Sequence, residues 1–381
     1  MIYCLKCVLP DTKPDLALGD DGVCSACHSY DSRTKIDWES RERDFIELVK
    51  SLGSNPSAYD CLVPVSGGKD STYQVLKLKE LGLNPLAVTA TTCALSPIGA
   101  RNIENLKRQG VDHFAVSPNP NVRAMLNKAG LEIVGDISWP EHVGIFTIPI
   151  RVAVWLGIPL IVWGENSQNE YGGPEEAAKR ANLDRKWLEE FGGLLGLRVS
   201  DIPSVAGVTE KDMFLYSYPS DNEIEKLGLK GLFLGQFFPW DGLSNALVAQ
   251  ANGFETLGQR VEGSIVDYEN LDNYQTGIHD YFKFLKFGFG RASDLASLHV
   301  RRGRFSRNTA IELVKQFDGK FPWTYLGNPI EEILRPIGIG LDQFMSICDQ
   351  FTNRALFETN SDGSLARDSS HSLIKLKYDN E

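Results

Sequence analysis

The chain has 381 residues, of which 42% are hydrophobic and 23% are charged, as in a globular protein with one large α/β domain and smaller attachments. Its 50 acidic residues outnumber its 39 basic residues, and the net charge of −11 argues against a general affinity for the nucleic-acid backbone. No basic segment followed by an apolar core opens the sequence, so we expect no secretory signal and a cytoplasmic protein.

Four cysteines near the start of the chain have the spacing of metal ligands. They form two Cys-x2-Cys pairs separated by sixteen residues: Cys4, Cys7, Cys24 and Cys27. In a reducing compartment each pair presents two thiolates to one tetrahedral ion, so the spacing predicts a structural zinc-ribbon module over residues 1–35. Disulfides, a redox pair and an iron–sulfur cluster are the alternatives. Among the scattered cysteines, Cys61 and Cys348 fit core positions, and Cys93 is interpreted as inert.

Strands and helices alternate after this module. Apolar patterns and stop signals predict strands over 61–65, 84–91, 111–116 and 159–163, and helices over 44–52, 71–81, 99–109, 121–129 and 143–156. Such alternation builds a parallel sheet whose ligand lies at the carboxyl ends of the strands. Residues 143–164 could pass for a membrane span, but Arg151 and two prolines within them favour a buried helix followed by a buried strand.

The second half of the chain reads as mainly helical. We expect exposed helices over 174–195, a strand over 231–238 with a helix after it, and helices over 307–317, 329–334 and 341–357. The tail from residue 360 is polar and is expected to be loosely held.

The motif between the first strand and its helix indicates a phosphate cradle. Residues 64–71 read Pro-Val-Ser-Gly-Gly-Lys-Asp-Ser, whose adjacent glycines let backbone N–H groups turn toward an anion while the next helix adds its positive end. The Walker A pattern needs four residues between its glycines, so this is not an ordinary P-loop. A glycine-rich turn without a ligand is the alternative. Asp70 either reaches a magnesium ion or caps its helix, and Lys69 is expected to be a mobile cation.

This run resembles the Ser-Gly-Gly-x-Asp-Ser signature of the PP-loop ATP pyrophosphatase superfamily. The resemblance implies that the loop grips the β,γ-pyrophosphate of ATP and exposes the α-phosphorus, so that AMP and pyrophosphate form. The residues that would hold ATP are Ser66, Gly67, Gly68, Lys69, Asp70, Ser71, Thr91 and Thr92. Glu165 and Asn166 end another strand and could hold metal, ribose or the reacting group, although Asn166 could instead cap a turn.

Basic residues concentrate between Tyr281 and Arg307, where Asp294 is the only acidic residue. They are Lys283, Lys286, Arg291, Arg301, Arg302, Arg304 and Arg307. The cluster predicts a local anion site, with a solvated basic helix face as the alternative. Lys283, Lys286 and Arg291 are our candidates for binding either the phosphates of a sugar nucleotide or the departing pyrophosphate. The six histidines show no metal-ligand spacing, and His279 is interpreted as a surface residue, with contact to the substrate as the alternative.

The cysteine pairs, residues 64–71, Trp163-Gly-Glu-Asn166, Phe238-Pro-Trp-Asp241 and residues 282–291 together resemble the N-acetyl sugar amidotransferase family, which is WbpG/PseA-like. The resemblance implies a HUP-like PP-loop domain over 57–300 and a C-terminal helical region over 301–381. It implies that ATP and Mg²⁺ are used to convert an acetamido group on a nucleotide-linked sugar into an acetamidino group, through an O-adenylyl imidate. Such enzymes serve surface-polysaccharide (O-antigen) or nonulosonic acid biosynthesis.

The source of nitrogen is indicated by what the sequence lacks. Met1-Ile2-Tyr3-Cys4 has no cysteine nucleophile at its start, and no cysteine lies in a Gly-x-Cys-x-Gly elbow. The resemblance therefore implies that a HisH-like glutaminase with a HisF-like subunit supplies ammonia. Two alternatives remain open. One is a zinc-ribbon PP-loop tRNA thiolase, which is disfavoured by the net acidity and by the lack of a second active cysteine pair besides the metal-ligand cysteines. The other is a non-catalytic nucleotide-binding subunit, which is disfavoured by the intact motif.

Overall fold

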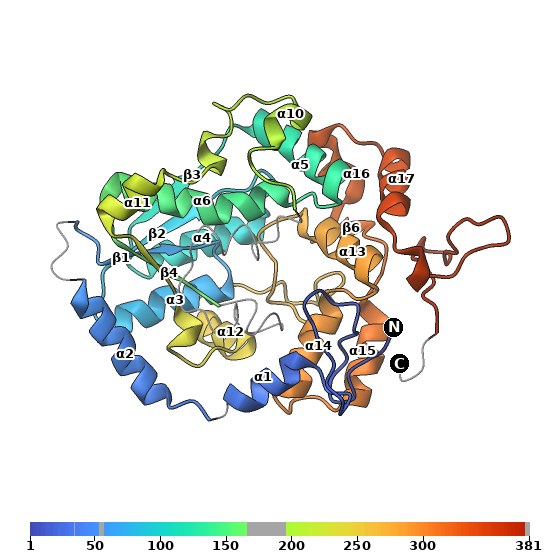
Figure 1. Ribbon diagram of the computed structural model, residues 1–381, viewed down its shortest axis with the longest axis horizontal. Coiled ribbons are helices and arrows are strands. Elements are labelled where there is room, and N and C mark those ends of the chain that lie inside the picture. The colour runs from blue at the N-terminus through green and yellow to red at the C-terminus, as the bar shows by residue number, and fades with distance from the viewer. Residues whose placement is uncertain (34, 53–56, 166–195, 378–381) are drawn as a thin grey trace.

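The computed structural model describes residues 1–33, 35–52, 57–165 and 196–377. It contains a five-stranded parallel sheet in the order β3-β2-β1-β4-β5, which lies in the left part of the view in Figure 1. The strands are β1 (Cys61–Pro64), β2 (Pro85–Ala90), β3 (His113–Val116), β4 (Leu160–Trp163) and β5 (Lys230–Phe233). The predicted α/β class is confirmed. The strand order reverses direction between β1 and β4, which is where an open parallel sheet forms a ligand crevice.

Helices cover both faces of this sheet, which explains why its strands are apolar on both sides. Along β1, Cys61 and Val63 pack toward α2 (Trp38–Ser51) and α3 (Lys69–Glu80), whereas Leu62 packs toward α6 (Trp139–Leu156). The remaining elements of this half are α4 (Pro97–Arg108), α5 (Pro120–Val134), α10 (Ile202–Ala206), α11 (Asp221–Leu227), α12 (Gly242–Ala251) and the 3₁₀ turns η1 (Phe214–Tyr216) and η2 (Leu234–Gln236).

Residues 143–164 form most of α6 and all of β4, as the interrupted apolar pattern predicted. Within the part of the chain that the structure describes, no helix combines the length and apolarity needed to cross a bilayer.

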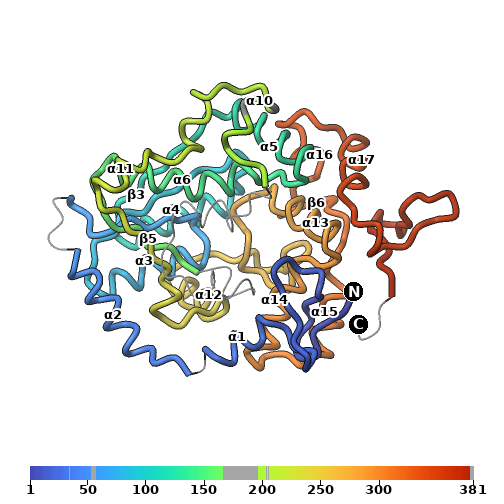
Figure 2. The backbone as a smooth tube through the Cα atoms, viewed as in Figure 1, coloured from blue at the N-terminus to red at the C-terminus, as the bar shows by residue number. Residues whose placement is uncertain are grey.

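From Thr276 onward the chain forms a helical region beside the sheet domain. It contains α13 (Thr276–Phe287), α14 (Arg291–Arg301), α15 (Arg307–Phe317), α16 (Ile330–Leu334), α17 (Leu341–Phe351), the short hairpin of β6 (Thr324–Tyr325) and β7 (Asn328–Pro329), and the turns η3 (Arg335–Ile337) and η4 (Arg354–Leu356). The N-terminal segment, which ends in α1 (Ser25–Arg33), lies against α14 and α15 (Figure 2). The first and last thirds of the chain are therefore in contact.

Several sequence predictions differ from the structure. The predicted strand over 231–238 ends at Phe233, because the chain turns through η2 and buries Phe237 and Phe238 against Phe45 of α2. The predicted helix over 341–357 ends at Phe351, and Asn353 caps the separate turn η4 with its side chain. The helices expected over 174–195 fall outside the described residues. The domain boundaries at 57, 300 and 301 stay predictions.

The tail beyond residue 360 is held more firmly than predicted. Two antiparallel bridges, Thr359 to Leu365 and Arg367 to Leu373, fold it back on itself, and both leucines are buried. Arg367 also forms an ion pair with Asp349. The polar composition of the tail did not predict that two buried leucines would hold it in place.

Candidate functional site

The predicted phosphate loop joins β1 to the first turn of α3. Gly67 has φ +84°, and a Cβ there would lie 2.8 Å from Ile103 Cγ1 and 2.9 Å from its backbone nitrogen, so the position accepts only glycine. The hydroxyls of Ser71 and Thr72 each donate to the Gly68 carbonyl at 3.0 Å, which fixes the start of the helix. The loop thus opens onto the carboxyl ends of the strands, beside the positive end of α3.

Lys69 and Asp70 begin α3 and are tied to residues far along the chain. The Lys69 side chain is only 8% exposed, contacts Asp70, and lies 3.1 Å from Glu269 Oε1. Our prediction of a mobile cation at this position was therefore wrong. The buried amide of Asn245, on α12, donates to Asp70 Oδ1 at 2.8 Å. Asp70 remains partly exposed, with its position set by Lys69 and Asn245.

Two adjoining cavities meet at this loop. The first, of about 390 Å³, lies at the ends of β1, β2 and β4, and the second, of about 430 Å³, lies between the loop and the helical region. Ser66, Asp70, Ser71 and Glu165 line both cavities. Gly67, Gly68 and Lys69 line the second cavity, whereas Thr91 and Thr92 line the first. The sequence-predicted nucleotide residues therefore gather around one continuous space.

Glu165 is oriented by Trp240, a residue of the Phe238-Pro-Trp-Asp241 motif for which the sequence predicted no separate role. The indole nitrogen of Trp240 donates to Glu165 Oε2 at 3.0 Å. Arg302 in turn donates to the Trp240 carbonyl at 3.0 Å and lies 3.0 Å from Asp241 Oδ2. These contacts connect the helical region to the mouth of the cavities. Asn166 lies outside the described residues.

Asp241 also starts α12, where its side chain accepts from the backbone nitrogens of Leu243 and Ser244. Although burial opposes it, the hydrogen bond from Arg304 and the charge of Arg302 hold the pKa of Asp241 below its usual value. An ionised cap at this position fixes α12 and therefore the amide of Asn245. The Phe238-Pro-Trp-Asp241 motif thus acts as a support for the loop.

Most of the basic cluster is used inside the protein. Lys283 pairs with Asp294, and the ammonium of Lys286 donates to the carbonyls of Val134 and Gly135 at 2.6 and 3.0 Å. Of the three candidate phosphate ligands, Arg291 is the one that lines the second cavity, where it lies 3.0 Å from Asp280 Oδ1. Neither Lys283 nor Lys286 is among the residues that line the two cavities.

The two remaining arginines of this cluster support the N-terminal module. Arg307 donates to the carbonyls of Cys4 and Cys7 at 3.2 and 3.0 Å, and Arg301 lies 4.0 Å from the Cys7 sulfur. Neither a single anion site nor a solvated helix face describes the cluster as a whole.

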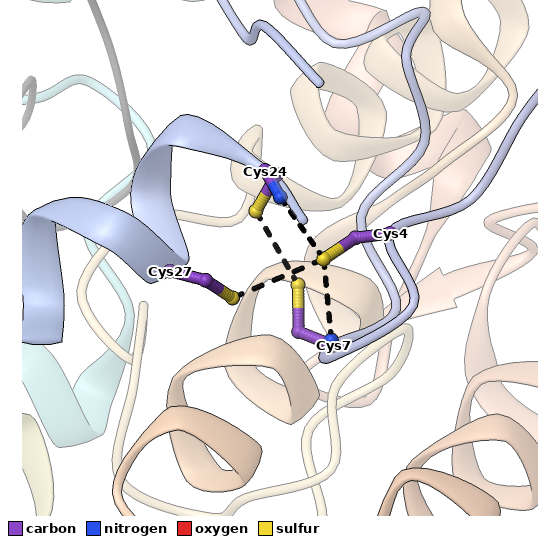
Figure 3. A group of neighbouring side chains, drawn as sticks. All are labelled: Cys4, Cys7, Cys24 and Cys27. Carbon is purple, nitrogen blue, oxygen red and sulfur yellow. Dashed lines mark hydrogen bonds between the residues drawn. The ribbon is translucent and has the colours of Figure 1, made fainter. Parts of the chain in front are cut away.

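The four N-terminal cysteines converge on one point (Figure 3). All are fully buried, and their ligand atoms lie within 4.8 Å of one another, with Cys7 to Cys24 at 3.7 Å and Cys4 to Cys27 at 4.0 Å. Four thiolates about 2.3 Å from a tetrahedral ion would be about 3.8 Å apart, whereas a disulfide requires about 2.05 Å. Backbone N–H groups of Lys6, Cys7 and Cys24 donate to the Cys4 sulfur, which stabilises a thiolate. The geometry fits a metal ion and no disulfide.

The sheet, the Ser-Gly-Gly-Lys-Asp-Ser loop and the crevice at the strand ends define an α/β protein of the PP-loop type. Residues 262–370 match the family model described as LPS biosynthesis protein WbpG-like, C-terminal domain. Over these residues the chain is similar to the WbpG-like C-terminal domain, in agreement with its resemblance to the WbpG/PseA-like family. No curated protein sequence matches this chain significantly.

Solved structures that overlap part of the chain include the following three. An NH3-dependent NAD synthetase from Campylobacter jejuni is 11% identical with a TM-score of 0.29, covering 57% of this chain and 97% of its own. An NMN synthetase from Francisella tularensis is 14% identical with a TM-score of 0.24, covering 51% and 92%. A predicted subunit of tRNA methyltransferase from Methanocaldococcus jannaschii is 18% identical with a TM-score of 0.20, covering 48% and 93%. The activities in these names belong to those proteins.

Proposed function

We propose that this protein is an ATP-dependent, AMP-forming amidotransferase that converts the acetamido group of a nucleotide-linked N-acetyl sugar into an acetamidino group. One observation carries the proposal: the WbpG-like domain supplies residues 268–272 and Arg291 to the cavity that begins at the phosphate loop. These residues face the loop that would hold the phosphates of ATP, which suits a substrate activated by ATP. The family description supports a place in surface-polysaccharide synthesis.

The proposed chemistry requires an amide oxygen to become a leaving group. That oxygen attacks the α-phosphorus of ATP, pyrophosphate leaves, and ammonia then displaces AMP from the O-adenylyl imidate. Ser66, Gly67, Gly68 and Ser71 would hold the pyrophosphate, whose position decides which phosphorus is exposed. Asp70 is partly exposed and lines both cavities, so its carboxylate suits a Mg²⁺ ion, which when bound would offset the charge of the leaving pyrophosphate.

A label in the acetamido carbonyl tests this route. With oxygen-18 in that carbonyl, we expect the AMP to carry the label and the pyrophosphate to carry none, because the amide oxygen leaves bound to the α-phosphorus. Mass spectrometry of both products reads the result. Unlabelled AMP formed together with the amidine, or ADP and phosphate as products, would refute adenylation of the amide.

Ammonia is proposed to come from a HisH-like glutaminase with a HisF-like subunit, since the sequence has no glutaminase nucleophile. The purified chain should form the amidine with ammonium and not with glutamine, and adding the cognate glutaminase pair should restore the use of glutamine. Amidine formed per unit time under each condition is the measurement. Turnover with glutamine in a rigorously pure preparation of the single chain would contradict the proposal that a partner supplies the ammonia.

For the ion held by Cys4, Cys7, Cys24 and Cys27 we propose Zn²⁺, in a structural role. A set of four thiolates leaves no open coordination position, and zinc is the common ion of such sites. The cluster is buried beneath α14 and α15 rather than facing the cavities, which supports a structural role.

A further inference from the structure

A second group of metal-ligating side chains lies at the junction of α5, α6 and α13. Asp136 follows Gly135, the glycine that ends α5, and its Oδ1 accepts the backbone N–H of Ser138 at 3.0 Å. His142, in the first turns of α6, places its Nδ1 2.9 Å from Asp136 Oδ2. His279, in the corresponding part of α13, places its Nδ1 2.8 Å from Asp136 Oδ1. Two histidines from separate helices therefore face one carboxylate.

Hydrogen bonding does not account for all of this geometry. The Asp136 side chain is 2% exposed. Its Oδ2 and the Nδ1 of His142 lie 2.9 Å apart, yet neither atom has a hydrogen bond of good geometry. An N–H on that ring nitrogen would not point along the line to the oxygen. Leaving a buried carboxylate oxygen and a buried ring nitrogen unpaired destabilises the folded protein. Lone pairs that converge on a cation would remove this cost.

The surrounding charges also leave room for a cation. Glu141 lies beside the cluster, and burial raises its pKa. Asp280, next to His279, is paired with Arg291, and Asn127 donates to Glu141 Oε2 at 2.8 Å. Arg123 and Lys286 are the nearby basic groups, and Lys286 donates to the backbone carbonyls that precede Asp136. A protonated His142 paired with Asp136 at 2.9 Å is the competing arrangement, and counting bound cobalt distinguishes it from a metal ion held by the two residues.

We infer that Asp136, His142 and His279 form a site for a divalent transition-metal ion such as Zn²⁺ or Co²⁺. Their ligand atoms lie within 4.8 Å of one another. Metal–ligand distances of about 2.0–2.2 Å place the ligand atoms of a tetrahedral ion about 3.4 Å apart, so the 2.8 and 2.9 Å contacts to Asp136 would open slightly around the ion. Two imidazoles and one carboxylate are a ligand set of metal sites that keep open positions.

The open positions of this ion would face the second cavity, because His142 lines it together with the phosphate loop. Their ligand would be an oxygen of the cavity's occupant, such as a hydroxyl, carbonyl or phosphate oxygen. The site is separate from the cysteine cluster and from Asp70, and it does not rest on the proposed function.

Cobalt binding to the full-length chain tests the site without any substrate. Metal-free protein is dialysed against Co²⁺, and bound metal is counted by elemental analysis while the absorption spectrum is recorded. Cobalt at the cysteine cluster gives an intense thiolate charge-transfer band, whereas cobalt at a histidine–carboxylate site gives none. The intensity of the thiolate band gives the amount of Co²⁺ at the cysteine cluster. In the wild type, we expect the total bound Co²⁺ to exceed that amount by one equivalent.

Variants then assign the extra equivalent to these residues. Asp136→Asn and His279→Gln should each lose it and keep the thiolate band, and His371→Gln, which removes a histidine on the exposed tail, should retain it. Circular dichroism checks that each variant folds. Equal stoichiometry in the wild type and both folded variants would overturn the proposal. The proposal would also be overturned, without any variant, if all the cobalt bound by the wild type were at the cysteine cluster according to the thiolate band.

Discussion

Replacing Asp70 by asparagine is expected to slow pyrophosphate release from ATP by roughly a hundred- to a thousandfold, the loss typical of removing one electrostatic contact to a developing charge. Asparagine keeps the size of the side chain and can still meet the amide of Asn245, so the loop should retain its shape. The negative charge that would hold Mg²⁺ is lost. Nucleotide affinity should weaken far less than the rate, because the loop glycines and the helix terminus remain.

The measurement is the initial rate of pyrophosphate release at saturating ATP and Mg²⁺, alongside calorimetric titration with ATP. Asp112→Asn is a matched control: it also neutralises an aspartate, but one at the amino end of β3, where the carboxylate accepts a hydrogen bond from Tyr59. It should leave the rate unchanged. A rate for Asp70→Asn within about threefold of the wild type would remove Asp70 from the proposed mechanism.

Replacing Cys24 by serine is expected to release the N-terminal ion and to loosen residues 1–33, while ATP still binds to the sheet domain. The four buried sulfurs form the centre of that module, so folding and metal binding should be coupled there. Elemental analysis should fall by one equivalent of zinc. Limited proteolysis should cut the module at least about tenfold faster than in the wild type, since a locally unfolded segment is cleaved from its open state.

Cys93→Ser is the control for this prediction, because Cys93 is the exposed cysteine of the chain and lies outside the cluster. It should keep its zinc and its resistance to the protease. Wild-type protein purified without chelator that contains less than half an equivalent of zinc would contradict a structural zinc site, as would a Cys24→Ser protein that retains the metal.

The phosphate loop and the sheet could be predicted because their signals are local. Gly67 and Gly68 lie between a strand and a helix within one short run, and the cysteine pairs keep a fixed spacing. Asn245 and Glu269 could not be found this way. They reach Asp70 and Lys69 from about 175 and 200 residues away, and only the packing of α12 and of the segment before α13 brings them there.

The same reasoning explains the misread histidines and basic residues. His142 and His279 lie on different helices, so no spacing along the chain could connect them, and His279 was interpreted as a surface residue. The positive charges of Lys283 and Arg291 could be predicted from the sequence, but their ion pairs with Asp294 and Asp280 could not. Helices α13 and α14 were not predicted, because basic residues are interspersed among the apolar positions that bury Phe282, Leu285 and Leu295.

The contacts of the N-terminal module also bear on the order in which the protein is made. Cys4, Cys7 and Leu9 are buried together with Phe289, Thr12 donates to the Phe287 carbonyl at 2.6 Å, and Arg307 holds the cysteine loop. On the ribosome, the first residues to emerge must wait until about three hundred have been translated before this surface is covered. During that interval four thiols are open to oxidation or to the wrong ion. Slow translation or oxidative stress should therefore damage this end of the protein first.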